Sequence, residues 1–190
     1  MLESELQWVC CDGGPHLLLP AELVSAWEGT SPPSGGRIVD ARFRYTMDPA
    51  SPATDYDLAC DVEGELGLIP VGGGEGLVID DEVPMSTWVL APDGLGGDLV
   101  VWVSGPEDGD EWVIRVCREA PLHLLLDTGL TLSVGDGGLF LFPACDWAPE
   151  WVYGFISIPL PPGRYRVLTV EYEQDSEGCL RLHRLQRWME

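Results

Sequence analysis

Glycine and proline interrupt the apolar segments of this sequence along its whole length. The chain holds 23 glycines and 16 prolines among 190 residues, and both residues favour tight turns and end regular structure. The apolar stretches between them are short, and many contain valine, isoleucine and aromatic residues, which suit strands. The sequence therefore predicts short strands joined by turns and not a fold built on long helices.

Two hairpins are the clearest local signals. The apolar runs at 66–71 and 76–80 flank three glycines, and the runs at 86–90 and 98–103 flank a second turn. The apolar alternation of the run at 164–173 slips in its middle, which predicts a β-bulge. Further strands are expected at 6–11, 16–19, 38–45, 122–126, 130–134, 139–142, 155–159 and 179–185.

Helices and loops take a smaller part of the chain. Pro20 can open a short helix over 21–27, and four apolar residues in 112–117 share one face at helical spacing. Residues 30–36 and 46–54 are rich in turn formers and predict exposed loops. We therefore expect a mainly β fold, with sandwich-like antiparallel sheets and one or two short helices.

A weak internal repeat relates an early segment of the chain to a late one. Residues 12–14 (Asp-Gly-Gly) lead into an apolar run that ends in Pro20-Ala21. Residues 136–138 (Asp-Gly-Gly) lead into a similar run that ends in Pro143-Ala144, and tryptophan follows both runs. This order suggests that one structural unit occurs twice.

The repeat continues downstream, where residues 68–79 match residues 156–167 in the order apolar run, proline, turn and apolar run. We therefore hypothesise two related β-rich halves, an acidic one over 1–105 and a second one over 106–190, packed as one globular unit. Chance similarity between β segments rich in glycine and proline remains the alternative.

The charge of the chain is strongly negative. Ten basic residues, all arginine, stand against 32 acidic ones, so the net charge is -22. Nucleic acid as a ligand is excluded, and an anionic membrane surface is disfavoured, because both need a basic protein surface. The excess lies in residues 1–163, since 164–190 hold equal numbers of both signs. The expected partner is cationic, although the acidity could also serve only to keep the protein soluble.

The N-terminal residues and the cysteines indicate a cytoplasmic protein. Residues 1–7 lack the basic and apolar regions of a signal peptide, and no apolar run approaches the length of a membrane span. The six cysteines include no Cys-x-x-Cys pair, so we expect most of them to be small buried residues rather than disulfide partners.

Most catalytic arrangements are missing from the sequence. The chain has no lysine, which excludes a phosphate-binding loop lysine and a Schiff base, and no serine stands in a Gly-x-Ser-x-Gly motif. The three histidines have no zinc spacing. We therefore expect no catalytic site, no metal site and no cofactor.

Acidic clusters and loop tryptophans are the candidate partner-binding residues. Paired carboxylates could also serve a glycosidase or hold a hard cation, and each cluster equally suits a solvated loop. Tryptophan beside acid in a loop suits a binding surface, although core packing is the alternative. The candidates are Asp55, Asp57, Asp61, Glu63, Glu107, Asp108, Asp110, Glu111, Trp147 and Trp151.

A series of segments in the first hundred residues is more specific than composition. The segments are, in order, Trp8 with Asp12-Gly13-Gly14-Pro15 and Trp27, Asp55-Tyr56-Asp57-Leu58-Ala59-Cys60, Gly67-Leu68-Ile69-Pro70-Val71-Gly72, Leu77-Val78-Ile79-Asp80-Asp81-Glu82, Ser86-Thr87-Trp88 and Trp102-Val103. In this order they resemble the immunity protein 21 family of bacterial polymorphic toxin systems. The likeness covers residues 6–105 and is looser up to 161–166, and Asp12 stands where the family often has threonine.

The resemblance implies a cytoplasmic, non-catalytic protein that binds a toxin. The family is assigned to immunity because its genes lie near toxin genes, so the resemblance names no toxin and supplies no catalytic residues. We expect an acidic, tryptophan-bearing surface that blocks a cognate toxin domain, and a basic nuclease fits best because carboxylates can mimic phosphates. The alternatives are a carbohydrate-binding or carbohydrate-processing β protein and a regulatory β module.

Overall fold

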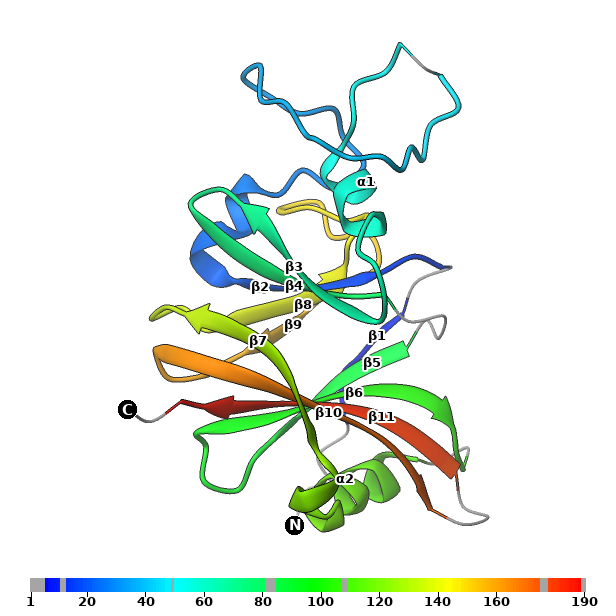
Figure 1. Ribbon diagram of the computed structural model, residues 1–190, viewed down its shortest axis with the longest axis vertical. Helices are drawn as coiled ribbons and strands as arrows, with labels where there is room; N and C mark the ends of the chain where they lie inside the picture. Colours follow the sequence, from blue (N-terminus) through cyan, green and yellow to red (C-terminus); the bar gives the residue numbers. More distant parts are fainter. Residues whose placement is uncertain are drawn as a thin grey trace.

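Two antiparallel β-sheets lie face to face and form the body of the protein (Figure 1). The computed structural model describes residues 6–10, 13–48, 50–80, 85–106, 109–174 and 178–188. Sheet A has six strands in the order β1-β5-β6-β11-β10-β7, and sheet B has five in the order β3-β4-β2-β8-β9. The prediction of a mainly β fold with antiparallel sheets and few short helices is confirmed.

The elements have the following bounds. Sheet A contains β1 (Trp8–Cys10), β5 (Met85–Leu90), β6 (Gly96–Ser104), β7 (Leu126–Val134), β10 (Gly163–Gln174) and β11 (Gly178–Arg187). Sheet B contains β2 (His16–Pro20), β3 (Leu66–Val71), β4 (Gly74–Ile79), β8 (Leu139–Pro143) and β9 (Ile156–Ile158). The helices are η1 (Ala21–Ala26), α1 (Asp55–Cys60), α2 (Asp110–Glu119) and η2 (Leu122–Leu124), of which η1 and η2 are 3-10 helices.

The main core fills the space between the two sheets. Alternate residues of each strand face inward, so Leu18 and Leu141 of sheet B pack in one cluster with Leu99, Tyr165 and Val167 of sheet A, all fully buried. Burial of this apolar surface supplies the principal driving force for folding.

Helices cover the two outer faces. Val113 and Val116 of α2 pack on Val100 and Leu182 of sheet A. On the outer face of sheet B, η1 and α1 pack with Trp27 in a second cluster. Figure 1 accordingly shows four layers, with α1 and its preceding loop at one end, then sheet B, sheet A and α2 at the other end.

Most of the predicted elements are present. The two hairpins are β3–β4 and β5–β6, the helix near residue 112 is α2, and the bulge in β10 lies between Arg166 and Leu168. Asp12 of the predicted turn lies outside the described residues.

Two strand predictions are wrong. Residues 38–45 form no strand. Their backbone N–H groups do not pair with a neighbouring strand, because Asp57 and Asp61, at the two ends of α1, accept hydrogen bonds from Tyr45 and Phe43. Residues 122–124 form the 3-10 helix η2 after Pro121, and Leu122 and Leu126 are 69% and 68% exposed, so this apolar run is not a buried strand.

The order of the strands places the first half of the chain on one side of each sheet. In sheet B, β2 meets β8, and Leu18 pairs with Leu141 at corresponding positions of the repeated run. The downstream segments are arranged differently, since β3 and β4 pair with each other in sheet B whereas β9 and β10 lie in different sheets. A relation between the two halves stays a hypothesis.

Candidate functional site

A long loop projects from the molecule beyond sheet B (Figure 1). Residues 27–54 contain neither helix nor strand in their described part, which makes this the longest such stretch that the structure describes. We call residues 30–54 the projecting loop. Loops of this length without regular structure are uncommon and are usually either functional or disordered, so the contacts that hold this one decide between the two.

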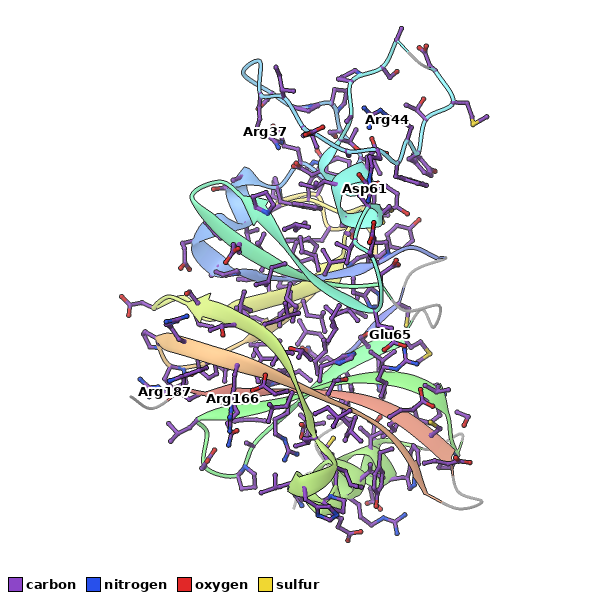
Figure 2. The ribbon with its side chains drawn as sticks, in the orientation of Figure 1. Arg37, Arg44, Asp61, Glu65, Arg166 and Arg187 are labelled. Carbon is purple, nitrogen blue, oxygen red and sulfur yellow. The ribbon has the colours of Figure 1, made fainter. Side chains whose placement is uncertain are left out.

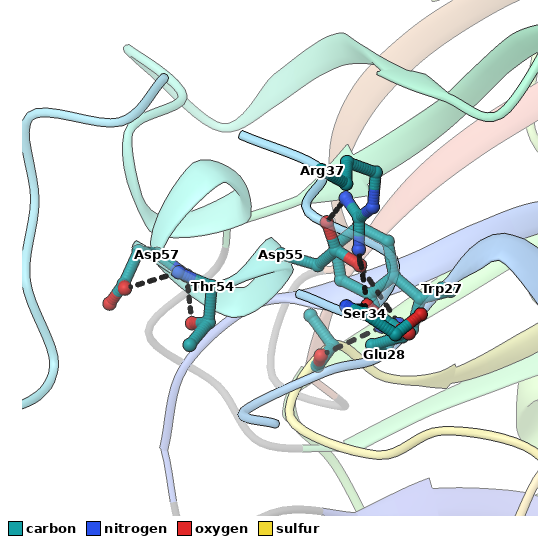
Figure 3. Close-up of polar contacts among 8 residues, drawn as sticks. Trp27, Glu28, Ser34, Arg37, Thr54, Asp55 and Asp57 are labelled. Carbon is teal, nitrogen blue, oxygen red and sulfur yellow. Dashed lines mark hydrogen bonds and ion pairs between the residues drawn. The ribbon is translucent and has the colours of Figure 1, made fainter. Parts of the chain in front are cut away.

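The projecting loop ends in a capped helix. Thr54 is the N-cap of α1, and its Oγ1 accepts a hydrogen bond from the N–H of Asp57 at 3.2 Å. The Oδ2 of Asp57 in turn accepts one from the N–H of Thr54 at 2.8 Å, which completes a capping box (Figure 3). Asp57 is fully buried, so its carboxylate binds groups within the protein.

Asp55 fixes the beginning of the projecting loop. Its carboxylate, 3% exposed, binds Arg37 through two hydrogen bonds of 2.5 and 2.9 Å and accepts a third from the N–H of Glu28 at 2.8 Å (Figure 3). The bidentate geometry is the strong form of this ion pair. The hydrogen bond from Arg37 to Asp55 raises the pKa of the guanidinium, and hydrogen bonds from Ser34 lower the pKa of Glu28.

The middle of the loop is held by carboxylates at the two ends of α1. Asp61, the C-cap of α1, accepts hydrogen bonds from the N–H groups of Arg42 and, at 2.7 Å, Phe43. The Oδ1 of Asp57 accepts one from the N–H of Tyr45 at 2.6 Å. Burial raises the pKa of Asp61, but these hydrogen bonds outweigh it and the net shift is downward. The loop is therefore ordered by side chains of one short helix.

The loop presents large apolar side chains to solvent. Ile38 and Met47 are 92% and 95% exposed, Tyr45 is 65% exposed and Phe43 is 41% exposed. The ring of Tyr45 also contacts that of Tyr56 edge to face, at 5.4 Å between centroids. Four large exposed apolar side chains within ten residues are more than the single scattered ones that a protein surface normally carries, so this segment is a candidate interaction site.

A small pocket lies beneath the loop, with a volume of about 120 Å³. Small-molecule sites usually have volumes of about 300–1,000 Å³, so this pocket suits no more than a single inserted side chain. Its lining residues are Thr30, Pro32, Tyr45, Thr46, Ser51, Pro52, Thr54 and Asp57.

The predicted tryptophans lie at the same end of the molecule. Trp147 and Trp151 are half-buried, and Trp151 contacts Phe142 and Phe155 at 4.9 Å between centroids. The loop that carries them meets the base of the projecting loop, where the N–H of Thr30 donates to the carbonyl of Cys145. The structure therefore brings the tryptophans near the acidic residues of α1.

The second acidic cluster lies at the opposite end, at the start of α2 (Figure 1). The carboxylate of Asp110 accepts hydrogen bonds from the N–H of Leu6 at 2.8 Å and from Nε1 of Trp8 at 3.0 Å. Glu111 is exposed, and Glu107 and Asp108 lie outside the described residues. The predicted residues thus divide between two ends and do not form one patch.

Sequence reasoning missed the apolar tip of the projecting loop. The predicted strand at 38–45 has Val39, Ala41, Phe43 and Tyr45 in its apolar phase, but only the first two are buried. Phe43 and Tyr45 face solvent, as does Ile38 on the other phase. The available signal was charge, since Arg37, Arg42 and Arg44 precede the carboxylates of 55–61. Figure 2 shows Arg37, Arg44 and Asp61 together at this end, far from Arg166 and Arg187 on sheet A.

The histidines take no part in this site. In the core between the sheets, Nδ1 of His16 is hydrogen bonded to Ser86 at 2.8 Å and Nδ1 of His183 to Thr169 at 2.9 Å. Burial lowers the pKa of His16 to about 4 and that of His183 to about 3. In the described part of the chain, no three His, Cys, Asp or Glu side chains gather as metal ligands, and no helix is long and apolar enough to cross a membrane.

The comparison with known families decides the class of protein. The model of the immunity protein 21 family matches residues 7–178. The chain belongs to the immunity protein 21 family. The resemblance carried by residues 6–105 is thereby confirmed, and it extends over most of the chain. No curated protein and no solved structure matches the chain. Membership implies neutralisation of a toxin, and proteins of this family are typically non-catalytic.

Proposed function

We propose that this immunity protein neutralises a basic bacterial toxin domain, of which a nuclease is the best candidate, by binding it in the cytoplasm. Family membership indicates that the partner is a toxin, and the net charge of -22 indicates that this toxin is basic. A strongly acidic protein steers a cationic partner into encounter and raises the association rate. Carboxylates can also occupy positions that a nuclease offers to phosphates.

The proposed binding face is the end of the molecule formed by the projecting loop, α1 and residues 144–155, the loop that carries Trp147 and Trp151. Among the predicted residues there, Glu63 is exposed, and Trp147 and Trp151 are half-buried. Asp55 and Asp57 act from inside by holding the loop, so their part in binding is to shape the face rather than to touch the toxin. Glu111 lies at the far end and is assigned to long-range attraction only.

A carbohydrate site has less support. Such a site needs an apolar cleft with two facing acids, whereas the described pocket holds about 120 Å³ and has Asp57 as its one carboxylate. That carboxylate already accepts hydrogen bonds from Thr54 and Tyr45. Neutralisation of a toxin therefore remains the proposed function.

Calorimetric titration tests this function. The probe is the cognate toxin domain, purified in a catalytically inactive form and titrated at ionic strengths of about 0.05 and 0.3 M. We expect a one-to-one complex whose Kd weakens at least about tenfold at the higher ionic strength. Binding that is insensitive to salt would contradict a basic partner, and no binding at either ionic strength would contradict the proposed function itself.

A further inference from the structure

We infer that the tip of the projecting loop, formed by Ile38, Phe43, Tyr45 and Met47, is the anchor that inserts into the cognate toxin domain, and that the carboxylates of α1 hold this anchor in its binding shape. The inference rests on the proposed function, because it takes the toxin as the partner. It differs from the sequence-based expectation in that acidic residues position the contact surface and apolar side chains make the contact.

The exposure of the tip is the first observation. Ile38 and Met47 are 92% and 95% exposed, and Phe43 and Tyr45 expose large parts of their rings within the same ten residues. Binding energy at protein interfaces is concentrated in a few large side chains near the centre of the contact. Aromatic residues and methionine are also enriched at such surfaces. The tip therefore has the composition of an interface centre.

The order of the loop is the second observation. Asp61 binds the N–H groups of Arg42 and Phe43, Asp57 binds that of Tyr45, and Asp55 binds the side chain of Arg37. These bonds fix the backbone at Arg42, Phe43 and Tyr45 and tie the side chain of Arg37 to α1. Because the loop is already held before binding, less conformational entropy is lost when it docks.

The charge around the tip identifies the occupant as a cationic protein. Asp40, Asp48 and Glu63 are exposed in this part of the chain. Arg37 is paired with Asp55 and Glu28, and Arg42 with Asp61 and Glu63, whereas Arg44 donates to the carbonyls of Ala41 and Phe43. Residues 28–63 nevertheless hold seven acidic residues against three arginines, a net charge of -4. Apolar side chains on an acidic segment fit a basic partner that has an apolar recess.

The same charge argues against the other occupants. Two copies of this chain would each bring a net charge of -22, so self-association through this face is opposed by repulsion. An anionic lipid surface is opposed for the same reason. The toxin domain, which the family requires as partner, is the occupant that we propose.

The double substitution Ile38→Ala with Met47→Ala tests the anchor. The two side chains are almost wholly exposed, so we expect the thermal unfolding midpoint to stay within a few degrees of the wild type. The Kd for the inactive toxin domain should rise about 30-fold or more. The matched control is Leu122→Ala with Leu126→Ala, whose side chains are 69% and 68% exposed but lie in η2 and β7, outside the proposed binding face, and its Kd should change less than about threefold.

A second pair of variants separates the positioning of the loop by a carboxylate from the loss of a negative charge. Asp61→Ala removes the carboxylate that binds two loop N–H groups, whereas Glu63→Gln removes an exposed charge that pairs only with the side chain of Arg42, at 3.0 Å. Each variant loses one negative charge. If Asp61 positions the loop, Asp61→Ala should weaken binding at least about fivefold more than Glu63→Gln. It should also abolish hydrogen-exchange protection of the Arg42 and Phe43 amides in the free protein.

The possible outcomes distinguish failure of the anchor from failure of the proposed function. If the wild type binds the toxin domain and the tip variant binds it equally well, the anchor is overturned while the proposed function stands. If the folded wild type does not bind the toxin domain, both are overturned. If light scattering shows a wild-type dimer that the tip substitutions dissociate, a second copy occupies the face and the anchor is again overturned.

Discussion

Acidification should destabilise this protein through its two core histidines. His16 and His183 are buried between the sheets, and burial lowers their pKa values to about 4 and about 3, from 6.5 for a free side chain. Because the folded pKa values are lower, the unfolded chain binds more protons below pH 6.5. Their contribution to stability is therefore complete above pH 6.5 and falls as the pH decreases toward the folded pKa values.

The size of the effect follows from these pKa values. Each histidine costs about 1.4 kcal/mol of unfolding free energy for every pH unit below its unfolded pKa. Between about pH 7 and pH 5, the cost is about 2 kcal/mol for each histidine and about 4 kcal/mol for the pair. This range stays above the ordinary pKa values of most carboxylates, so their titration contributes little.

Urea denaturation at about pH 7 and pH 5 measures this cost. We expect His183→Gln to halve the difference in unfolding free energy between the two pH values, whatever its effect at pH 7. His123→Gln is the matched control for loss of a histidine, because His123 is exposed and not buried in the core. If a variant that lacks both His16 and His183 keeps the pH dependence of the wild type, the core histidines do not cause it.

Three further predictions concern stability and are measured as changes in the free energy of unfolding by urea denaturation. Leu18→Ala, at the fully buried junction of β2 with β8, should cost about 2–5 kcal/mol. Gly29→Ala should destabilise clearly more than Gly35→Ala. Both glycines have a positive φ, but a methyl group on Gly29 would meet the carbonyl oxygen of Cys145 at 2.5 Å, whereas Gly35 faces open space. Arg184→Met should cost about 3–5 kcal/mol, because it leaves the buried carboxylate of Asp98 without its bidentate partner, and the added change Asp98→Asn should recover part of that loss.

The strands and helices were predictable where the local sequence pattern agrees with the tertiary pairing and packing. Around Gly72 and Gly73, the turn and the flanking apolar runs belong to one hairpin, so local and tertiary preferences coincide. The face of α2 that packs on sheet A was visible as helical spacing over 112–117. The bulge in β10 was visible because it shifts the phase of the buried positions.

The projecting loop was not predictable in the same way. Val39, Ala41, Phe43 and Tyr45 alternate with other residues as in a half-buried strand, and no local signal shows that Phe43 and Tyr45 face solvent. Its conformation depends on Asp55, Asp57 and Asp61, which follow the loop in the chain and bind backbone groups from 12 to 27 residues earlier. Such bonds exist only once α1 has packed on sheet B. The sequence therefore showed the acidic residues of 55–63 but not that Asp55 and Asp57 are buried and hold the loop.

Titration of a toxin's own activity with this immunity protein tests most directly whether the protein neutralises it. The cognate toxin domain is assayed with increasing amounts of the wild type and of the variant that carries Ile38→Ala and Met47→Ala. We expect complete inhibition by one equivalent of the wild type and incomplete inhibition by one equivalent of the variant. Full toxin activity in a large excess of folded wild-type protein would show that this protein does not neutralise the toxin.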